Sequence, residues 1–230
     1  MPYNKSGQSV RSNYEIAKAT LGQVGISAKT AKLTQHTLRL EAQLTTSATQ
    51  YQFGVLVNQQ SPGASGSSFN TEVKLNLQDS FFVHEIGVFI ANPASASATG
   101  FRLLTYPDSL VFTTTGVAAA TQALYNGNIS LSVDNDTIVP SWDLVRHNNI
   151  PNPNSYAVAS GQNPPMTSGF DGTTQGLAPV EPMWILNGKQ NINLRLNLQS
   201  ALTAVETNQR VVVLLRGHLA QNVGINLNLL

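Results

Sequence analysis

Hydrophobic and polar residues alternate along most of this chain with a period of two, not the period of 3.6 that a helix shows. The clearest stretch is NINLRLNLQ, residues 191–199, in which Ile or Leu at every second position alternates with amides and one arginine. Similar alternation predicts strands over residues 37–44, 51–57, 72–78 and 225–229. Turn-forming residues separate these segments, so the pattern predicts an antiparallel all-β fold.

Two further segments, residues 81–90 and 211–219, are hydrophobic at almost every position and rich in Val, Ile and Phe. Such continuous runs are typical of strands that are covered on both faces. We therefore expect these two segments in the middle of the fold.

Two Asn-Gly pairs predict tight hairpin turns, at Asn126–Gly127 and at Asn187–Gly188. A two-residue type I′ turn needs positive φ at both central positions, which Asn and Gly adopt most readily. The second pair predicts that the strand in residues 191–199 forms a hairpin with the segment around Trp184.

Helical pattern is scarce. Ser12 and Glu15 stand three residues apart, the spacing of a capping box, and predict a short helix that begins there. Residues 200–206 are a second short helical candidate.

These elements predict one domain with an arm. Residues 1–32 are expected to form an N-terminal arm, and residues 33–230 a β-sandwich. Residues 148–182 are rich in Pro, Asn and Gly and predict a long surface loop that reaches toward another subunit.

Composition favours an assembling protein. Only 11% of the 230 residues are charged, against about 25% in ordinary globular proteins. The net charge is +1, so no strong nucleic-acid footprint is expected. Neutral amide and hydroxyl residues replace the missing charges. Because freely soluble monomers depend on charge to stay dispersed, we expect much of this surface to be buried between subunits.

The polar face of residues 191–199 is the candidate subunit interface, because it carries amides where a solvent-facing strand usually carries charge. Its residues are Asn191, Asn193, Arg195, Asn197 and Gln199. The arm has a mild excess of positive charge, which predicts contacts with a neighbouring subunit and at most a weak contact with nucleic acid, through Lys5, Arg11 and Lys18.

The sequence carries no catalytic or metal-binding motif, and we expect a non-enzymatic protein without a cofactor. The chain has no cysteine, and its four histidines stand at no metal-ligand spacing. His84 and Glu85 are adjacent in a strand, which predicts that their side chains point to opposite faces. Asp134 and Asp136 have the alternate spacing of a calcium loop, although a turn rich in Asp and Asn is favoured.

No apolar run is long enough to predict a membrane-spanning helix.

The arm, the predicted sandwich, the low charge and the amide-rich strands EVKLNLQ and NINLRLNLQ together resemble the single jelly-roll capsid and accessory structural proteins of viruses and bacteriophages. This resemblance implies a single jelly roll that assembles into a closed shell or symmetric oligomer. It also implies a location in the virion, assembled in the host cytoplasm, and other virion proteins as partners.

A second hypothesis comes from a different class of protein. A β-sandwich module would recognise carbohydrate through the loop of residues 148–182, and the candidate aromatic residues for stacking on sugar rings are Trp142 and Trp184. The sequence favours packing of these aromatic residues into the sandwich.

Overall fold

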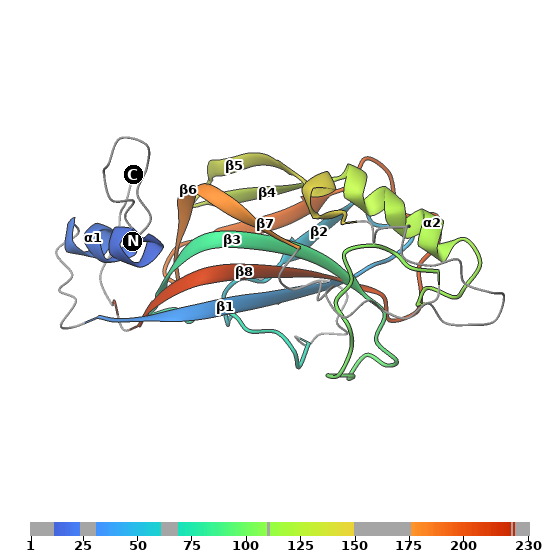
Figure 1. Cartoon of the computed structure of the whole chain (residues 1–230), viewed down its shortest axis with the longest axis horizontal. Coiled ribbons are helices and arrows are strands. Elements are labelled where there is room, and N and C mark those ends of the chain that lie inside the picture. Colours follow the sequence, from blue (N-terminus) through green and yellow to red (C-terminus); the bar gives the residue numbers. More distant parts are fainter. Residues whose placement is uncertain are drawn as a thin grey trace.

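The computed structural model describes residues 12–23, 31–60, 69–109, 111–149, 176–221 and 223. These residues form an antiparallel all-β sandwich of two four-stranded sheets, with strand orders β1-β8-β3-β6 and β2-β7-β4-β5 (Figure 1). The strands are β1 (Lys32–Gln43), β2 (Gln50–Phe53), β3 (Ser80–Ala91), β4 (Asn128–Val133), β5 (Asp136–Asp143), β6 (Leu177–Asn187), β7 (Ile192–Asn197) and β8 (Arg210–Gln221).

The pairing of the strands follows a simple rule. The first strand pairs with the last, the second with the seventh, the third with the sixth and the fourth with the fifth. The eight strands thus form one long two-stranded antiparallel ribbon, in which strands one to four run against strands eight to five. The ribbon turns back at the β4–β5 turn and is rolled up into the sandwich. Two further pairings, β3 with β8 and β4 with β7, close the roll into two sheets.

The core lies between the two sheets, and it explains why hydrophobic and polar residues alternate in β7. Ile192, Leu194 and Leu196 are fully buried, while Arg195 between them is exposed. Burial of each such aliphatic side chain stabilises the fold by roughly 1.5–3 kcal/mol. The predicted orientation of this strand is therefore confirmed.

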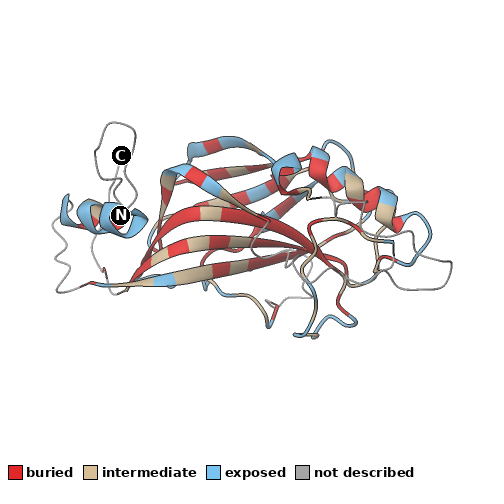
Figure 2. Cartoon of the chain, viewed as in Figure 1, coloured by how far each residue is buried: buried red, intermediate tan, exposed pale blue. Residues whose placement is uncertain are grey.

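The two hydrophobic segments are the central strands of one sheet, as predicted. β3 and β8 lie between β1 and β6, and Figure 2 shows both as almost continuously buried. Their second face is covered by α1 (Asn13–Gln23) at one end and by loop residues such as Phe101 and Leu103 at the other. We call the end that α1 covers the α1 end.

The helices lie outside the sandwich. α1 begins with the predicted capping box, since the Ser12 amide donates to Glu15 Oε2 at 3.0 Å and the Glu15 amide donates to Ser12 Oγ at 3.3 Å. The remaining helices, which the sequence did not predict, are α2 (Val117–Gln122), η1 (Ala123–Asn126) and η2 (Leu144–His147). The second predicted helix, over residues 200–206, is wrong, since those residues are irregular.

Both predicted Asn-Gly hairpins are wrong. After Asn187 the chain crosses from one sheet to the other, so β6 and β7 do not pair. Gly188 is needed there for close packing, because a Cβ would lie 2.1 Å from the Asn76 carbonyl oxygen. Gly127 has extended φ and ψ of −83° and −175°, and a Cβ there would lie 2.6 Å from the Asn197 carbonyl oxygen.

The hairpin turn with two positive φ angles is instead Asp134–Asn135, between β4 and β5. The φ angles are 50° and 76°, as a two-residue type I′ turn requires. The acidic spacing at Asp134 and Asp136 therefore belongs to a turn, which confirms the favoured interpretation.

Two other boundaries differ from the sequence prediction. Residues 72–78 form no strand and make only isolated bridges through Val73 and Leu75. The final part of the predicted loop in residues 148–182 is strand, because β6 begins at Leu177 and contains Pro179 and Pro182. β6 lies at the edge of its sheet, where a missing backbone N–H breaks no ladder.

Among the described residues, no helix is long and apolar enough to cross a membrane.

Candidate assembly surface

The outer face of the sheet β2-β7-β4-β5 carries a continuous row of polar side chains that are neutral except for Arg195. They extend over three neighbouring strands, because the register of β7 places its polar residues opposite those of β2 and β4. We call this surface the amide face. Its residues are Gln50, Gln52, Asn128, Ser130, Ser132, Asn193, Arg195 and Asn197, all exposed or half-buried.

The amides of this face bond to one another across the strands. Gln50 Nε2 donates to Asn197 Oδ1 at 2.8 Å, and Gln52 Nε2 donates to Asn193 Oδ1 at 2.9 Å. On the other side, Asn197 Nδ2 donates at 3.1 Å to both Asn128 Oδ1 and Ser130 Oγ. Each amide has one acceptor oxygen and two N–H donors, so groups such as Gln52 Oε1 and Asn193 Nδ2 are left without a partner among the described residues.

Arg195 lies in the middle of the amide face. Its direct neighbours across the strands are Gln52 on β2 and Ser130 on β4, which are both neutral. No described residue forms an ion pair with its exposed guanidinium. Five N–H donors are therefore presented by a fixed strand, a geometry that suits a carboxylate or carbonyl of another chain.

The predicted interface residues divide into two groups. Asn193, Arg195 and Asn197 share one face of β7, whereas Asn191 and Gln199 lie beyond the ends of the strand and are exposed. Asn191 donates its backbone N–H to Asp134 Oδ1 at 2.8 Å and so joins β7 to the β4–β5 turn.

The predicted arm contacts are placed only in part. Lys18 is exposed on α1, while Lys5 and Arg11 lie outside the described residues.

The sequence did not predict the contribution of β2 and β4 to this surface. The signal was present in the alternating polar positions of Gln50 and Gln52, and of Asn128, Ser130 and Ser132. Alternation assigns these residues to one face of their own strand. It does not say which strands are neighbours.

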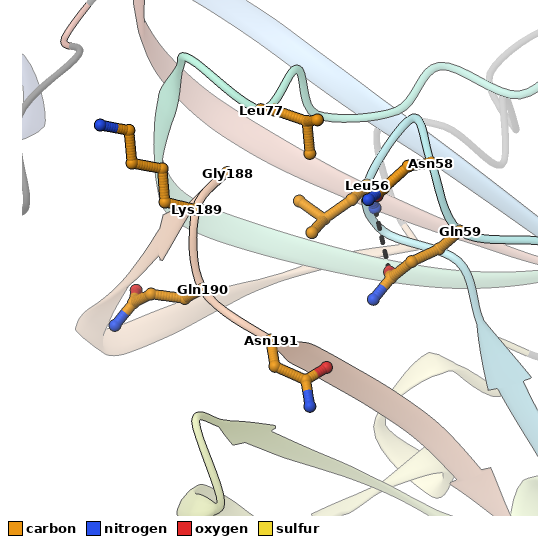
Figure 3. Close-up of a pocket in the computed structure, with 8 residues that line it drawn as sticks. All are labelled: Leu56, Asn58, Gln59, Leu77, Gly188, Lys189, Gln190 and Asn191. Carbon is orange, nitrogen blue, oxygen red and sulfur yellow. Dashed lines mark hydrogen bonds between the residues drawn. The ribbon is translucent and has the colours of Figure 1, made fainter.

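A cavity of about 470 Å³ opens at the α1 end, beside the residues that connect β6 to β7. Figure 3 shows Leu56 and Leu77 pointing into it, while the side chains of Lys189 and Gln190 point away from these two leucines. Gln59 Oε1 accepts a hydrogen bond of 3.1 Å from the Leu56 backbone amide. The Gln59 side chain therefore stabilises the conformation of the loop after β2.

The two tryptophans proposed for glycan binding are packed into the protein. Trp184 is 5% exposed, and Trp142 packs edge-to-face against it with 5.9 Å between ring centroids. Arg146 covers the ring of Trp142 at 4.8 Å. The pair is therefore a structural cluster and offers no open stacking platform.

His147 completes this cluster as a neutral residue. Its Nε2 accepts from Trp142 Nε1 at 2.9 Å, so the ring proton lies on Nδ1, which donates to the Gly176 carbonyl at 3.0 Å. Burial lowers the pKa of His147 below its ordinary value. The backbone bond to Gly176 opposes this shift, and the nearby Arg146 adds to it.

A buried group of charges lies on the outer side of the other sheet. Arg210 Nη1 donates to Glu41 Oε2 at 2.9 Å, and Arg39 Nε donates to Glu41 Oε1 at 2.7 Å. Arg210 also stacks on Phe69 at 4.0 Å and donates to the Ala96 carbonyl. These contacts fix two long loops to the sheet.

The prediction that His84 and Glu85 point to opposite faces is wrong. A β-bulge between Val83 and Glu85 inserts His84 into β3, so both side chains line one cavity on the outer side. The bulge is opposite Gly217, where a Cβ would lie 1.8 Å from the Phe82 carbonyl oxygen.

Comparison of the chain with protein-family models, with curated proteins and with solved structures found no match.

Proposed function

We propose that this chain is a structural subunit of a viral or bacteriophage particle, a capsid or capsid-associated protein that acts by self-assembly and not by catalysis. The observation that carries the proposal is the amide face, a neutral hydrogen-bonding surface with a single unpaired cation, Arg195, among the described residues.

The proposed architecture is a single jelly roll. Support comes from the rolled ribbon, in which strands one to four pair with strands eight to five and give two four-stranded sheets. Viral capsid proteins use this arrangement, but so do lectins and cupins. Because one fold hosts several functions, the proposal depends more on the amide face than on the strand topology.

The energetics of the amide face favour reversible contacts. Burying a neutral amide with a hydrogen-bond partner costs far less desolvation energy than burying an unpaired charge. Lateral bonds such as Gln52 to Asn193 hold the side chains in place before contact, so little rotamer entropy is lost on binding. Many weak contacts of this kind allow subunits to correct their positions during assembly.

The proposed partners are further copies of this chain and other virion proteins, with the particle assembled in the host cytoplasm. The basic residues of the arm, Lys5, Arg11 and Lys18, are proposed to contact a neighbouring subunit or, weakly, nucleic acid.

A carbohydrate-binding module is the alternative in this proposal. The packed state of Trp142 and Trp184 speaks against the stacking platform on which that alternative depended. What favours it is the cavity at the α1 end, whose lining combines the polar residues Asn58 and Gln59 with Leu56 and Leu77. No aromatic residue lines that cavity among the residues described.

Size-exclusion chromatography with light scattering, over a wide range of protein concentration, tests the proposal. The wild-type chain is expected to form oligomers. Arg195→Glu is expected to raise their dissociation constant about tenfold or more, which corresponds to a loss of about 1.4 kcal/mol of association free energy. Circular dichroism should show the variant folded, because Arg195 is exposed and alternates with the buried residues of its strand.

Lys32→Glu is the matched control, since Lys32 is an exposed cation on the other sheet and its reversal changes the net charge equally. A wild-type chain that stays monomeric at every concentration contradicts the proposal. Equal weakening by both variants would mean that net charge, and not the amide face, controls association.

A further inference from the structure

His84 and His218 form a close pair beneath α1. His84 Nε2 and His218 Nδ1 are 2.5 Å apart, although the residues are 134 positions apart in the chain. The rings pack edge-to-face, with 4.7 Å between centroids. One proton occupies the gap between the two nitrogens, because one must donate and the other accept.

The first turn of α1 lies on this pair. The Tyr14 ring packs edge-on against His218, with 5.6 Å between centroids. Asn13, the first residue of the helix, lines a cavity of about 230 Å³ together with both histidines. The N-terminus of the helix, with its partial positive charge and the Glu15 carboxylate of the capping box, therefore lies beside the two imidazoles.

The rest of the contact between α1 and the sheet is small. Ala17 and Leu21 are the buried residues of the helix, and they pack on Phe82 and Ala220. Only these two side chains of α1 are buried among the described residues, so the contacts at its N-terminus are a large part of what holds it on the sheet.

We propose that the His84–His218 pair is an acid-sensitive latch that holds α1 on the sheet while the pair is neutral and releases the helix when both rings become charged. The inference is independent of the proposed assembly function.

The chemistry of the pair supports this. The first added proton binds a ring nitrogen outside the gap and leaves the bond between the rings intact. The second makes both facing nitrogens N–H donors, and two N–H groups do not fit in a 2.5 Å gap. The rings then separate, carrying positive charge toward the helix N-terminus, where a cation is unfavourable.

The charged groups around the pair do not neutralise two protonated histidines. β3 contributes Glu85 and β8 contributes Arg216, and these bind each other at 3.1 Å, so the carboxylate is shared. β1 contributes the neutral Gln35, and α1 contributes Asn13 and Tyr14, with the Glu15 carboxylate bound to the Ser12 amide in the same turn. Burial and then the His218 charge lower the pKa of His84, against an opposing effect of Glu85, and burial lowers the pKa of His218.

The direction of the pH effect follows from these shifts. Since both pKa values are lowered in the docked state, the freed histidines bind protons more tightly. The stabilisation of the docked helix is present above the ordinary histidine pKa of about 6.5 and is lost as the pH falls below it.

Hydrogen–deuterium exchange of peptides covering α1 tests the latch, from about pH 7.5 to about pH 5.5 with EDTA present, after correction for intrinsic rates. The wild-type helix is expected to lose about tenfold or more of its protection at the acid end, while β3 and β8 stay protected. The double variant His84→Gln, His218→Asn should keep its protection, because Gln and Asn place an amide where Nε2 and Nδ1 lie but do not titrate.

His36→Gln is the matched control, since His36 packs against Phe81 on the inner side of the same sheet and should leave the wild-type loss unchanged. Unchanged protection of wild-type α1 at both pH values overturns the proposal, as does an equal loss in the double variant.

A second measurement covers the case in which the double variant does not dock α1 at neutral pH. Titration of the wild-type imidazoles by NMR should give two coupled steps below about pH 6.5, with the Tyr14 ring signals shifting at the second step. A single uncoupled step near pH 6.5 without a change at Tyr14 overturns the proposal.

Discussion

Arg210 donates a 2.9 Å hydrogen bond to the carboxylate of Glu41 in a site that excludes water from both side chains, although 169 positions separate the two residues. A buried ion pair of this kind adds little net stability over a well-packed apolar pair. Its effect is to hold the loops that contain Phe69 and Ala96 on the sheet, because both contact the same guanidinium.

Loss of the Glu41 charge should therefore be costly. Glu41→Gln removes the carboxylate that binds the buried Arg210 guanidinium and is expected to lower the free energy of unfolding by about 3–5 kcal/mol. Glu85→Gln is the matched control, because Glu85 and Arg216 are each 38% exposed and such pairs contribute about 0–1 kcal/mol. Urea denaturation at neutral pH measures both; similar midpoint shifts would show that Glu41 has no special role.

The tyrosine hydroxyls of Tyr125 and Tyr51 should differ in their effect on stability. Tyr125 is 2% exposed, and its hydroxyl has no hydrogen-bond partner among the described residues. Burial raises its pKa, so the hydroxyl stays neutral. Tyr125→Phe removes a desolvated group and is expected to leave stability unchanged or to raise it by up to about 1 kcal/mol.

Tyr51→Phe is the contrasting variant. The Tyr51 hydroxyl accepts from the Thr45 amide at 3.2 Å and donates to the Thr45 carbonyl at 3.1 Å, so its loss should lower stability by about 1 kcal/mol. Thermal unfolding of both variants measures the difference. A larger destabilisation by Tyr125→Phe than by Tyr51→Phe would contradict the assignment of hydrogen bonds at the two sites.

Acid should also act on His147. Its lowered pKa means that the folded state resists protonation, so the stability it contributes is present above about pH 6.5 and declines as the pH falls below that value. Trp142→Phe removes the donor to Nε2 and should move the His147 pKa upward, toward its ordinary value. NMR titration of the His147 ring in both proteins measures the shift.

The double variant His84→Gln, His218→Asn is the appropriate background for that titration, since it removes the two other histidines with lowered pKa values. An unchanged His147 pKa in Trp142→Phe would mean that the hydrogen bond from Trp142 does not contribute to the shift.

The sequence by itself determined the local features of this protein. The alternation in residues 191–199 correctly placed Leu194 in the core and Arg195 on the surface, because successive side chains of a strand without a bulge point to opposite faces. The capping box at Ser12 and Glu15 was equally readable, since its two hydrogen bonds span three residues.

Only the tertiary structure decided which segments are neighbours. The Asn187–Gly188 pair has the local signature of a hairpin, yet the chain crosses there to the opposite sheet, and β7 lies between β2 and β4. The pairing of His84 with His218 likewise needed both the bulge in β3 and the register of β8. Strand order and register are set by filling one shared core, which no short stretch of sequence contains.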